Sequence, residues 1–483
     1  MNNPLTTETP AKTHARPAAP PWLILTLVCT VQFLVVLDVA IVNVALPAMD
    51  AELSLGPAGL QWVVNGYALT SAGFLLLGGR AADLYGQRRV FLAGMAVFTL
   101  ASLVGGLATT PGLLVAARVV QGLGAAVISP ATLTILTTSI PEGPYRTRAI
   151  ATWGAMGAVG GAAGSIIGGL LTQTLSWRWV LLINVPIGIA AIVVALRYLA
   201  ESRDRGGRRL DLAGAISVTL GLSALEYGLV RTHDSGWGSA QALVPMGAGV
   251  VLLALFVLVQ ARFAKDPLMP LRVFRARSVT GANVVLLLVG GTGFAVWYFL
   301  SLYVQQVLNY TPLQAGLAIT PHALAIVVAS KLTPRLIGRI GLRPLIAFSA
   351  LLSAAGFLWQ AQLTPDSDFV TGILLPGILI TGGMGLGFAP LAMAATAGMA
   401  RGEEGLVSGI LNSSRQIGGS LGLAALVTVA AAHTGALAAG GTAAPDALTA
   451  GYSLAFLVSA GMNVVAAIAT IIIPGRRASG EPE

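Results

Sequence analysis

The chain has 483 residues, of which 10% are Asp, Glu, Lys or Arg and 55% are hydrophobic. Soluble proteins carry about 25% charged residues, so a soluble fold of this length could not cover its surface with so few charges. A mean hydropathy of +0.81 and recurring apolar runs indicate that the bilayer is the solvent. The net charge of +9 suits nucleic-acid binding, but a basic cytoplasmic face explains it with fewer assumptions. The single Cys29 excludes an internal disulfide.

Fourteen apolar runs are long enough to cross the hydrocarbon core, which takes roughly 20 helical residues. We therefore predict an all-α polytopic membrane protein with 14 transmembrane helices. The expected spans are at about 22–48, 58–79, 90–109, 112–137, 148–173, 179–199, 211–231, 241–262, 278–305, 313–333, 344–363, 369–397, 405–432 and 450–473. Residues 1–21 are polar and rich in Pro, and we expect them to form a disordered cytoplasmic N-terminus.

The charges of the loops predict the orientation. Of the 28 Lys and Arg residues, Arg178 and Arg231 fall in loops on one side, and Arg118 and Arg415 fall inside spans. The other 24 lie on the side that carries both termini. Because cytoplasmic loops carry the excess of Lys and Arg, we expect a multi-pass protein of the inner or plasma membrane with both termini in the cytoplasm.

An internal repeat links the loop after the second span with the loop after the tenth. A shift of 255 residues aligns Arg80 with Arg335, Gly86 with Gly341, and Arg88 with Arg343. This pattern predicts two six-helix halves at 22–205 and 271–474, an inserted helix pair at 206–270, and a cytoplasmic tail at 475–483. Parallel six-helix halves are the plan of major facilitator transporters.

Five motifs resemble those of the fourteen-span drug:proton antiporters of the major facilitator superfamily, and the resemblance covers roughly residues 20–475. They lie at 37–47, 79–89, 118–124, 160–169 and 411–416. One departure is Ser165, which stands where the fifth-span motif of the family usually carries Pro. The resemblance implies a major facilitator fold and proton-coupled export of amphipathic drugs or antibiotics by alternating access.

Asp38 and Arg118 are opposite charges inside the first and fourth spans. At 1.5 Å per residue from the outer ends of these spans, they lie at comparable depth. One interpretation is an ion pair that only holds two helices together. The other is a carboxylate that exchanges its proton for substrate, with Arg118 controlling its proton affinity. The family resemblance favours the second, because it associates these motif positions with proton coupling.

Two further motifs bear on conformational change. The family resemblance implies that the loop with Arg80, Asp83, Gly86, Arg88 and Arg89 latches the two halves in one conformation, although a solvated basic cluster is the alternative. The fifth span carries the exporter motif, with glycines at Gly160, Gly164, Gly168 and Gly169. Such spacing lets helices approach closely, either for static packing or for sliding between conformations.

The cavity between the halves is expected to be apolar and aromatic with few charges. Such a site suits amphipathic molecules of drug size, cationic or neutral, rather than sugars. The candidate cavity residues are Asn43, Trp62, Tyr67, Gln121, Trp297, Tyr298, His322 and Arg415. We leave open whether Arg415 binds an anionic substrate group or backbone carbonyls, and we expect His322 to be a neutral core histidine. Glu226 lies near the outer end of the seventh span, where we expect its carboxylate to snorkel to the interface.

Other functional classes find little support. The chain has no Gly-Lys-Ser/Thr phosphate loop, so it is not by itself an ATP-driven pump. It also lacks the Gly-x-Ser-x-Gly and His-Glu-x-x-His motifs, so we expect no enzymatic activity. A proton-coupled importer remains the alternative, since its two halves would look the same. We expect no cofactor and no nucleic acid, and a monomer whose partners are the substrate, protons and the lipid bilayer.

Overall fold

The computed structural model describes residues 20–141, 143–199, 211–236, 238–264, 267, 269–397 and 404–474. Within these residues, 14 helices are long and apolar enough to cross a membrane, and no strand occurs. The predicted all-α fold with fourteen spans is therefore confirmed. Residues 1–19 of the expected disordered N-terminus and the tail at 475–483 lie outside the described residues.

The elements follow the predicted spans, and most helices extend a few residues beyond the apolar runs. In chain order they are α1 (Pro21–Leu53), α2 (Gly56–Tyr85), α3 (Gln87–Gly106), α4 (Pro111–Ser139), α5 (Pro144–Thr174), α6 (Trp179–Leu182), α7 (Asn184–Tyr198), α8 (Leu212–Ser235), α9 (Ala240–Arg262), η1 (Leu271–Arg275), α10 (Arg277–Leu302), η2 (Tyr303–Val307), α11 (Pro312–Ile340), α12 (Leu342–Gln360), η3 (Phe369–Leu374), α13 (Leu375–Thr396), α14 (Glu404–Ala439), α15 (Ala444–Ala469) and η4 (Thr470–Ile472). The sixth span consists of the short α6 followed by α7, and the twelfth of η3 followed by α13.

Local sequence explains where several helices begin and end. Helices α1, α2, α4, α5 and α11 have Pro in the first turn. Backbone N–H groups in this turn have no acceptor within the helix, so Pro, which lacks the N–H, costs no hydrogen bond there. Thr311 and Gln314 form a reciprocal capping box at the start of α11. Gly86 after α2 and Gly341 after α11 have φ of 102° and 83°, which glycine adopts without a steric penalty. The repeated loop thus makes the same turn in both halves.

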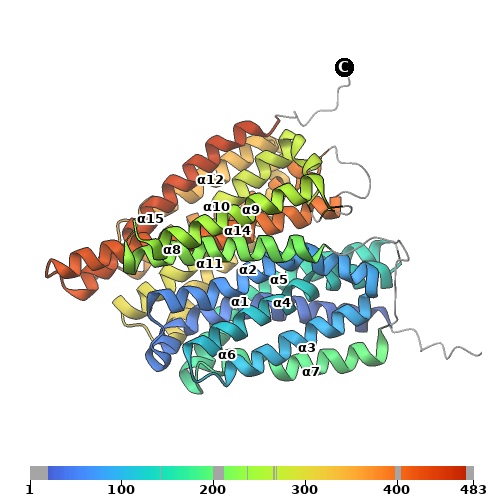
Figure 1. Ribbon diagram of the computed structural model, residues 1–483, viewed down its shortest axis with the longest axis horizontal. Coiled ribbons are helices and arrows are strands. Elements are labelled where there is room, and N and C mark those ends of the chain that lie inside the picture. Colours follow the sequence, from blue (N-terminus) through green and yellow to red (C-terminus); the bar gives the residue numbers. More distant parts are fainter. Residues whose placement is uncertain are drawn as a thin grey trace, which may run out of the picture.

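The packing of the helices also repeats. In the first half, α1 packs on α5, α2 on α4, and α3 on α4 and α7. In the second half, α10 packs on α14, α11 on α13, and α12 on α13 and α15. The halves meet where α5 packs on α11 and α14 packs on α2, which are equivalent pairs under the repeat. Figure 1 shows the first half in blue and teal below the second half in yellow to red.

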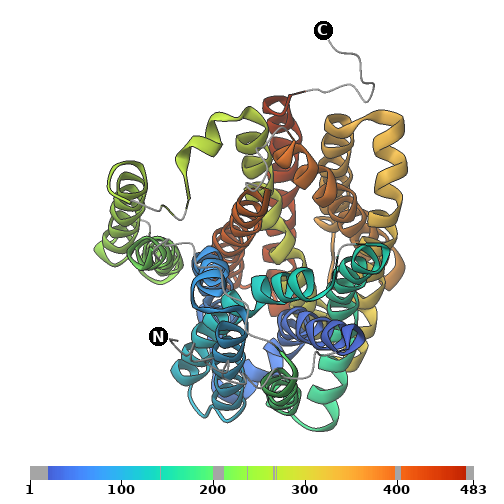
Figure 2. The ribbon, with the colours of Figure 1, turned by 90° about the vertical axis from the view of Figure 1, so that its right-hand side faces the viewer.

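Helices α8 and α9 pack on each other and lie outside the two six-helix bundles. Figure 2 shows this pair on one flank of the molecule. Of the two helices, α8 packs on both α2 and α14, so it contacts both halves where they meet.

Fourteen consecutive spans place the start of α1 and the end of α15 on one side, here called the termini side, and the opposite side is called the far side. Toward the far side, both halves share a buried core that includes Leu46, Met49, Phe299, Phe357 and Phe456. Hydrogen bonds also join the halves, from Ser301 Oγ to Asn43 O (2.8 Å), from Gln305 Nε2 to Val44 O (3.1 Å) and from Leu313 N to Gln173 Oε1 (3.3 Å). In Figure 1 the ribbons of the halves diverge toward the termini side. The far side is therefore closed.

Large apolar side chains cover the outside of the bundle. Val193, Val251 and Ile468 are 56%, 65% and 59% exposed. Apolar surface on this scale is unfavourable in water and is covered by lipid tails in a membrane. The protein is therefore a multi-pass membrane protein.

Candidate functional site

Asp38 and Arg118 form a buried ion pair. Arg118 Nη1 lies 2.6 Å from Asp38 Oδ2, and the two side chains are 2% and 0% exposed, respectively. Helix α1 supplies the carboxylate and α4 the guanidinium, so the two charges that we expected at comparable depth are in direct contact. The pair compensates the charge of each group, which would be costly to bury alone.

Neutral side chains from α3, α4 and α7 complete the surroundings of Asp38. Gln121 Nε2 and Asn184 Nδ2 each donate a 2.7 Å hydrogen bond to Asp38 Oδ1. Both amides also donate to Ser102 Oγ, at 2.7 and 3.1 Å. Sequence reasoning missed Ser102 and Asn184, although a polar Asn184 inside an otherwise apolar run was a detectable signal. The carboxylate is thus held by one cation and two amides.

Arg118 is fixed from three directions besides Asp38. Its Nε donates to Val63 O at 3.1 Å, and its Nη1 donates to Gln121 Oε1 at 2.7 Å. Its guanidinium carbon lies 4.5 Å from the centre of the Tyr67 ring, in cation–π geometry. Tyr67 and Gln121, which we expected in the cavity, therefore belong to the Asp38 network.

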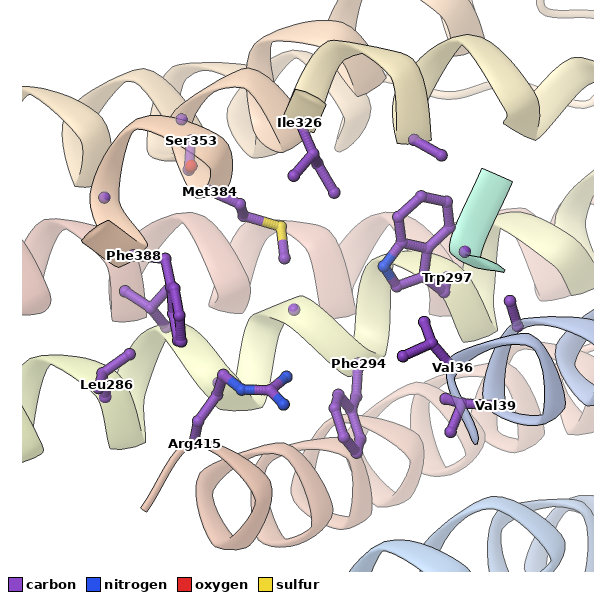
Figure 3. Close-up of a pocket in the computed structure, with 18 of the residues that line it drawn as sticks. Val36, Val39, Leu286, Phe294, Trp297, Ile326, Ser353, Met384, Phe388 and Arg415 are labelled. Carbon is purple, nitrogen blue, oxygen red and sulfur yellow. The ribbon is translucent and has the colours of Figure 1, made fainter. Parts of the chain in front are cut away.

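A cavity of about 360 Å³ lies between the two halves, within the range of sites for drug-sized ligands. Helices α1, α2 and α5 of the first half and α10 to α14 of the second line it. Figure 3 shows Phe294, Trp297, Met384 and Phe388 around this space. The lining is mostly apolar, as expected for an amphipathic substrate.

Three of the candidate cavity residues line this cavity, namely Asn43, Trp297 and Arg415. The structure places the others elsewhere. Trp62 is partly exposed, and Tyr298 is buried in the far-side core, where its ring packs edge-on against Phe299. His322 is 1% exposed, with its Nε2 3.2 Å from Ile373 O.

Arg415 is the one charged side chain among the described residues that line the cavity. Its Nη2 donates to Asn412 Oδ1, one helical turn away on α14, at 3.0 Å. Among the described residues, no carboxylate lies within 4 Å of its guanidinium. Figure 3 shows the side chain pointing into the space near Phe294 and Phe388. The cavity therefore carries a net positive group.

Helix α1 presents different faces to the cavity and to the ion pair. Val36, Val39, Ala40 and Asn43 line the cavity, at spacings of three and four residues that mark one helical face. Asp38 is two residues from Val36 and Ala40, which turns it about 200° away at 100° per residue. Opposite faces of one helix, α1, thus line the cavity and carry the buried carboxylate.

The glycines of α5 allow close packing on both halves. A methyl group on Gly160 would lie 2.8 Å from Phe33 O, and one on Gly164 2.6 Å from Ala40 Cβ. Gly168 packs equally closely on Ile41, so these three glycines face α1. Gly169 instead faces α11 of the other half, where a methyl group would overlap Pro312 O. The motif therefore serves packing within the first half and also the contact between halves.

The segment predicted as a loop at 79–89 is mostly helical, since Arg80 lies in α2 and Arg88 in α3, and only Gly86 separates the two helices. Its arginines contact neighbouring segments. Arg88 donates to the carbonyls of Ala195 (3.3 Å) and Leu196 (2.7 Å), near the end of α7, where a cation complements the helix dipole. Arg80 Nη1 donates to Pro267 O (3.2 Å), in the segment that leads to the second half. The placement of the Asp83 side chain lies outside the described residues, and Arg89 follows Arg88 in the first turn of α3.

The prediction that Glu226 snorkels to the interface is wrong. Its side chain is fully buried where α8 meets α2 and α14, and it accepts hydrogen bonds from Asn65 Nδ2 (2.6 Å) and Ser420 Oγ (3.2 Å). The helix continues nine residues past Glu226 to Ser235, so the carboxylate lies about 14 Å from its end. Sequence position alone placed this residue too close to the membrane surface.

Comparisons with known proteins agree with this architecture. A family model described as Major Facilitator Superfamily matches residues 28–423. The chain is 48% identical over 461 residues to the cephamycin export protein CmcT of Amycolatopsis lactamdurans, covering 95% of this chain and 93% of that protein. It is 38% identical to the puromycin resistance protein pur8 of Streptomyces alboniger, covering 94% and 92%.

Solved structures resemble the fold at low sequence identity. The peptide-family (POT) transporter PepTSo has a TM-score of 0.69 at 15% identity, covering 94% of this chain and 98% of that chain. A D-xylose–proton symporter has a TM-score of 0.67 at 12% identity, covering 94% and 98%. At such identities the likeness extends to the fold alone.

Proposed function

Because the chain belongs to the Major Facilitator Superfamily, as a transporter and not an enzyme, we propose that it exports amphipathic antibiotics in exchange for protons. Two relatives that match over more than 90% of the chain are named for cephamycin export and puromycin resistance. The apolar cavity between the halves carries the proposal, because burial of apolar area is the main source of affinity for such compounds.

Alternating access follows from the way the halves meet. At the far side, Gly169 and Gly316 bring α5 and α11 into contact, whereas nearer the termini side Gly157 and Ala323 line the cavity between the same helices. We propose that the termini side is cytoplasmic, since it carries the excess of Lys and Arg. In this conformation the cavity would then load from the cytoplasm, as export requires.

Cysteine labelling tests the orientation. Cysteines introduced at Asp234, in the last turn of α8, or at Asp366, between α12 and η3, are expected to react with an impermeant reagent added to intact cells, since both positions lie on the far side. Cysteines at Arg205 or Glu403, which lie outside the described residues, are expected to react only after permeabilisation. Labelling in the reverse pattern would overturn the cytoplasmic assignment.

Asp38 is the proposed site of proton coupling. In this conformation Arg118 and the two amides donate hydrogen bonds to the carboxylate. A shift of α1 relative to α4 would lengthen the 2.6 Å ion pair and favour proton uptake. Because the opposite face of α1 lines the cavity, a bound substrate can bias this shift. Substrate and proton thereby act on the same helix.

The cavity also bears on the charge of the substrate. We expected cationic or neutral compounds, partly because of Asp38. Asp38 does not line the cavity, and Arg415 is the one charged lining residue among those described. A cationic compound would be repelled by Arg415, so we propose that the substrates are neutral or carry an anionic group.

Transport driven by an imposed proton gradient tests the function. In proteoliposomes, protons that flow down their gradient in one direction are expected to drive neutral and anionic amphipathic antibiotics in the opposite direction. Cationic dyes are expected to move more slowly. Arg415→Gln removes the charge and keeps a polar side chain. It is therefore expected to bring the transport rates of anionic and cationic compounds closer together. Inward movement of sugars or amino acids together with protons would support the importer instead.

A further inference from the structure

Glu226 is a second fully buried carboxylate, and its surroundings differ from those of Asp38. Among the described residues, Asp38 and Glu226 are the two acidic side chains with 0% exposure. Asp38 is paired with Arg118, whereas no described Lys, Arg or His side chain lies within 4 Å of Glu226. An isolated carboxylate is far costlier to bury than a neutral carboxyl group. The site therefore favours the protonated form.

The hydrogen bonds around Glu226 suit a carboxyl group with a proton on Oε2. Oε1 accepts from Asn65 Nδ2 at 2.6 Å and from Gln61 Nε2 at 3.4 Å, as a carbonyl oxygen would. Ser420 Oγ lies 3.2 Å from Oε2 and donates to it when the carboxyl group is ionised. When Oε2 carries the proton, Oε2 donates to Ser420 Oγ instead, because a serine hydroxyl can accept as well as donate. Each oxygen of the neutral carboxyl group thus has a suitable partner.

Among the side chains that the structure describes, the other titratable groups on these helices contact other partners or lie toward the helix ends. Near the end of α2, Arg80 donates to Pro267 O and Tyr85 is exposed. On α2, Tyr67 packs against the Arg118 guanidinium, and on α14 Arg415 faces the cavity. On α8, Arg231 Nε donates to Tyr227 Oη. His433 lies thirteen positions after Ser420 on α14, and the titratable group of α9 is Arg262 in its last turn. None of these provides a counter-charge at Glu226.

The site joins three structural units. Glu226 belongs to the inserted pair, Gln61 and Asn65 to the first half, and Ser420 to the second. Asn65 Nδ2 also donates to Ser420 O at 3.1 Å, so Asn65 links both halves to the carboxyl group. A movement of α2 relative to α14 must change these contacts.

We propose that Glu226 is a proton-binding site of the inserted helix pair, protonated while α2 and α14 are packed and deprotonated when their contact opens to water. On opening, the bond between Oε2 and its hydrogen breaks and the proton passes to water. If closing the contact between α2 and α14 favours proton binding, then proton binding must favour the closed contact by the same factor. The inference rests on the proposed alternating access, but not on the identity of the drug or on the role of Asp38.

Infrared difference spectroscopy on the purified full chain in lipid nanodiscs tests the proton directly. The spectrum between neutral and alkaline pH is expected to contain the carbonyl stretch of a protonated carboxyl group, which Glu226→Gln removes. Asp38→Asn and Asp211→Asn serve as controls and are expected to leave this band in place. Asp211 is a matched carboxylate on the same inserted pair, where it caps α8 and accepts a hydrogen bond from Gln260. An unchanged band in Glu226→Gln would overturn the proposal.

Distance measurements test the link to conformation. The buried Cys29 is first replaced, so that only introduced cysteines carry labels. Spin labels are then attached to cysteines at Pro57 of α2 and Ala432 of α14, which are exposed toward the far side. The distance between the labels is expected to increase as pH rises. Glu226→Gln keeps a neutral hydrogen-bonding side chain, so it is expected to hold the labels close at all pH values and to slow transport about tenfold. The same pH dependence with and without Glu226 would contradict the proposed link. If the protein failed to export drugs but kept the infrared band of Glu226, the proposed export function would be contradicted and the proton site at Glu226 would be retained.

Discussion

Asp38→Asn is expected to abolish export driven by a proton gradient, although the protein still inserts into the membrane. Asn cannot ionise, so the exchange of a proton at this position is lost while the hydrogen bonds to Gln121 and Asn184 can persist. The measurement is drug movement in proteoliposomes with an imposed pH gradient. Because Asp38 does not line the cavity, drug binding to the purified variant is expected to be retained.

Variants of Arg118 separate coupling from structure. Arg118→Ala leaves Asp38 without a counter-charge, a change that typically costs about 3–5 kcal/mol for a buried pair, and is expected to abolish most coupled export. Arg118→Lys keeps the charge but loses the fork that contacts Asp38, Gln121 and Val63 O, so it is expected to retain part of the activity. Full gradient-driven transport by Asp38→Asn would remove Asp38 as the coupling site.

Gly169→Ala is expected to impair closure of the far side and to reduce transport strongly. The added methyl group would overlap Pro312 O and approach Leu313 Cα to 2.7 Å, and both atoms belong to the backbone of α11 in the other half. Overpacking typically costs about 1–3 kcal/mol. A difference of that size shifts an equilibrium between two conformations by roughly 5–150-fold. Transport rates and the distance between labels on α5 and α11 measure the effect.

Gly154→Ala is the matched control on the same helix. A methyl group on Gly154 would meet no atom within 4 Å, and Ala favours a helix more than Gly does. Normal transport by Gly154→Ala and loss by Gly169→Ala would show that the contact between halves limits the cycle. Equal activity of both variants would show that α5 and α11 need not approach this closely.

The sequence was sufficient for the architecture because the bilayer imposes simple rules. Apolar runs of about 20 residues must become helices. These runs predicted all 14 spans. The repeat at Gly86 and Gly341 predicted two related halves, since both glycines make the same turn. The pairing of Asp38 with Arg118 was also accessible, because opposite charges at one depth in a membrane have few other partners.

The tertiary structure alone decided which side chains share a site. Tyr67 and Gln121 proved to surround the ion pair, and Tyr298 lies in the far-side core. Helical rotation, which hydropathy does not reveal when a helix is apolar on all faces, determines such placements. Glu226 shows the same limit, because its burial depends on α8 packing where α2 meets α14. Contacts between helices distant in sequence set the environment of each buried charge, and those contacts exist only in the folded protein.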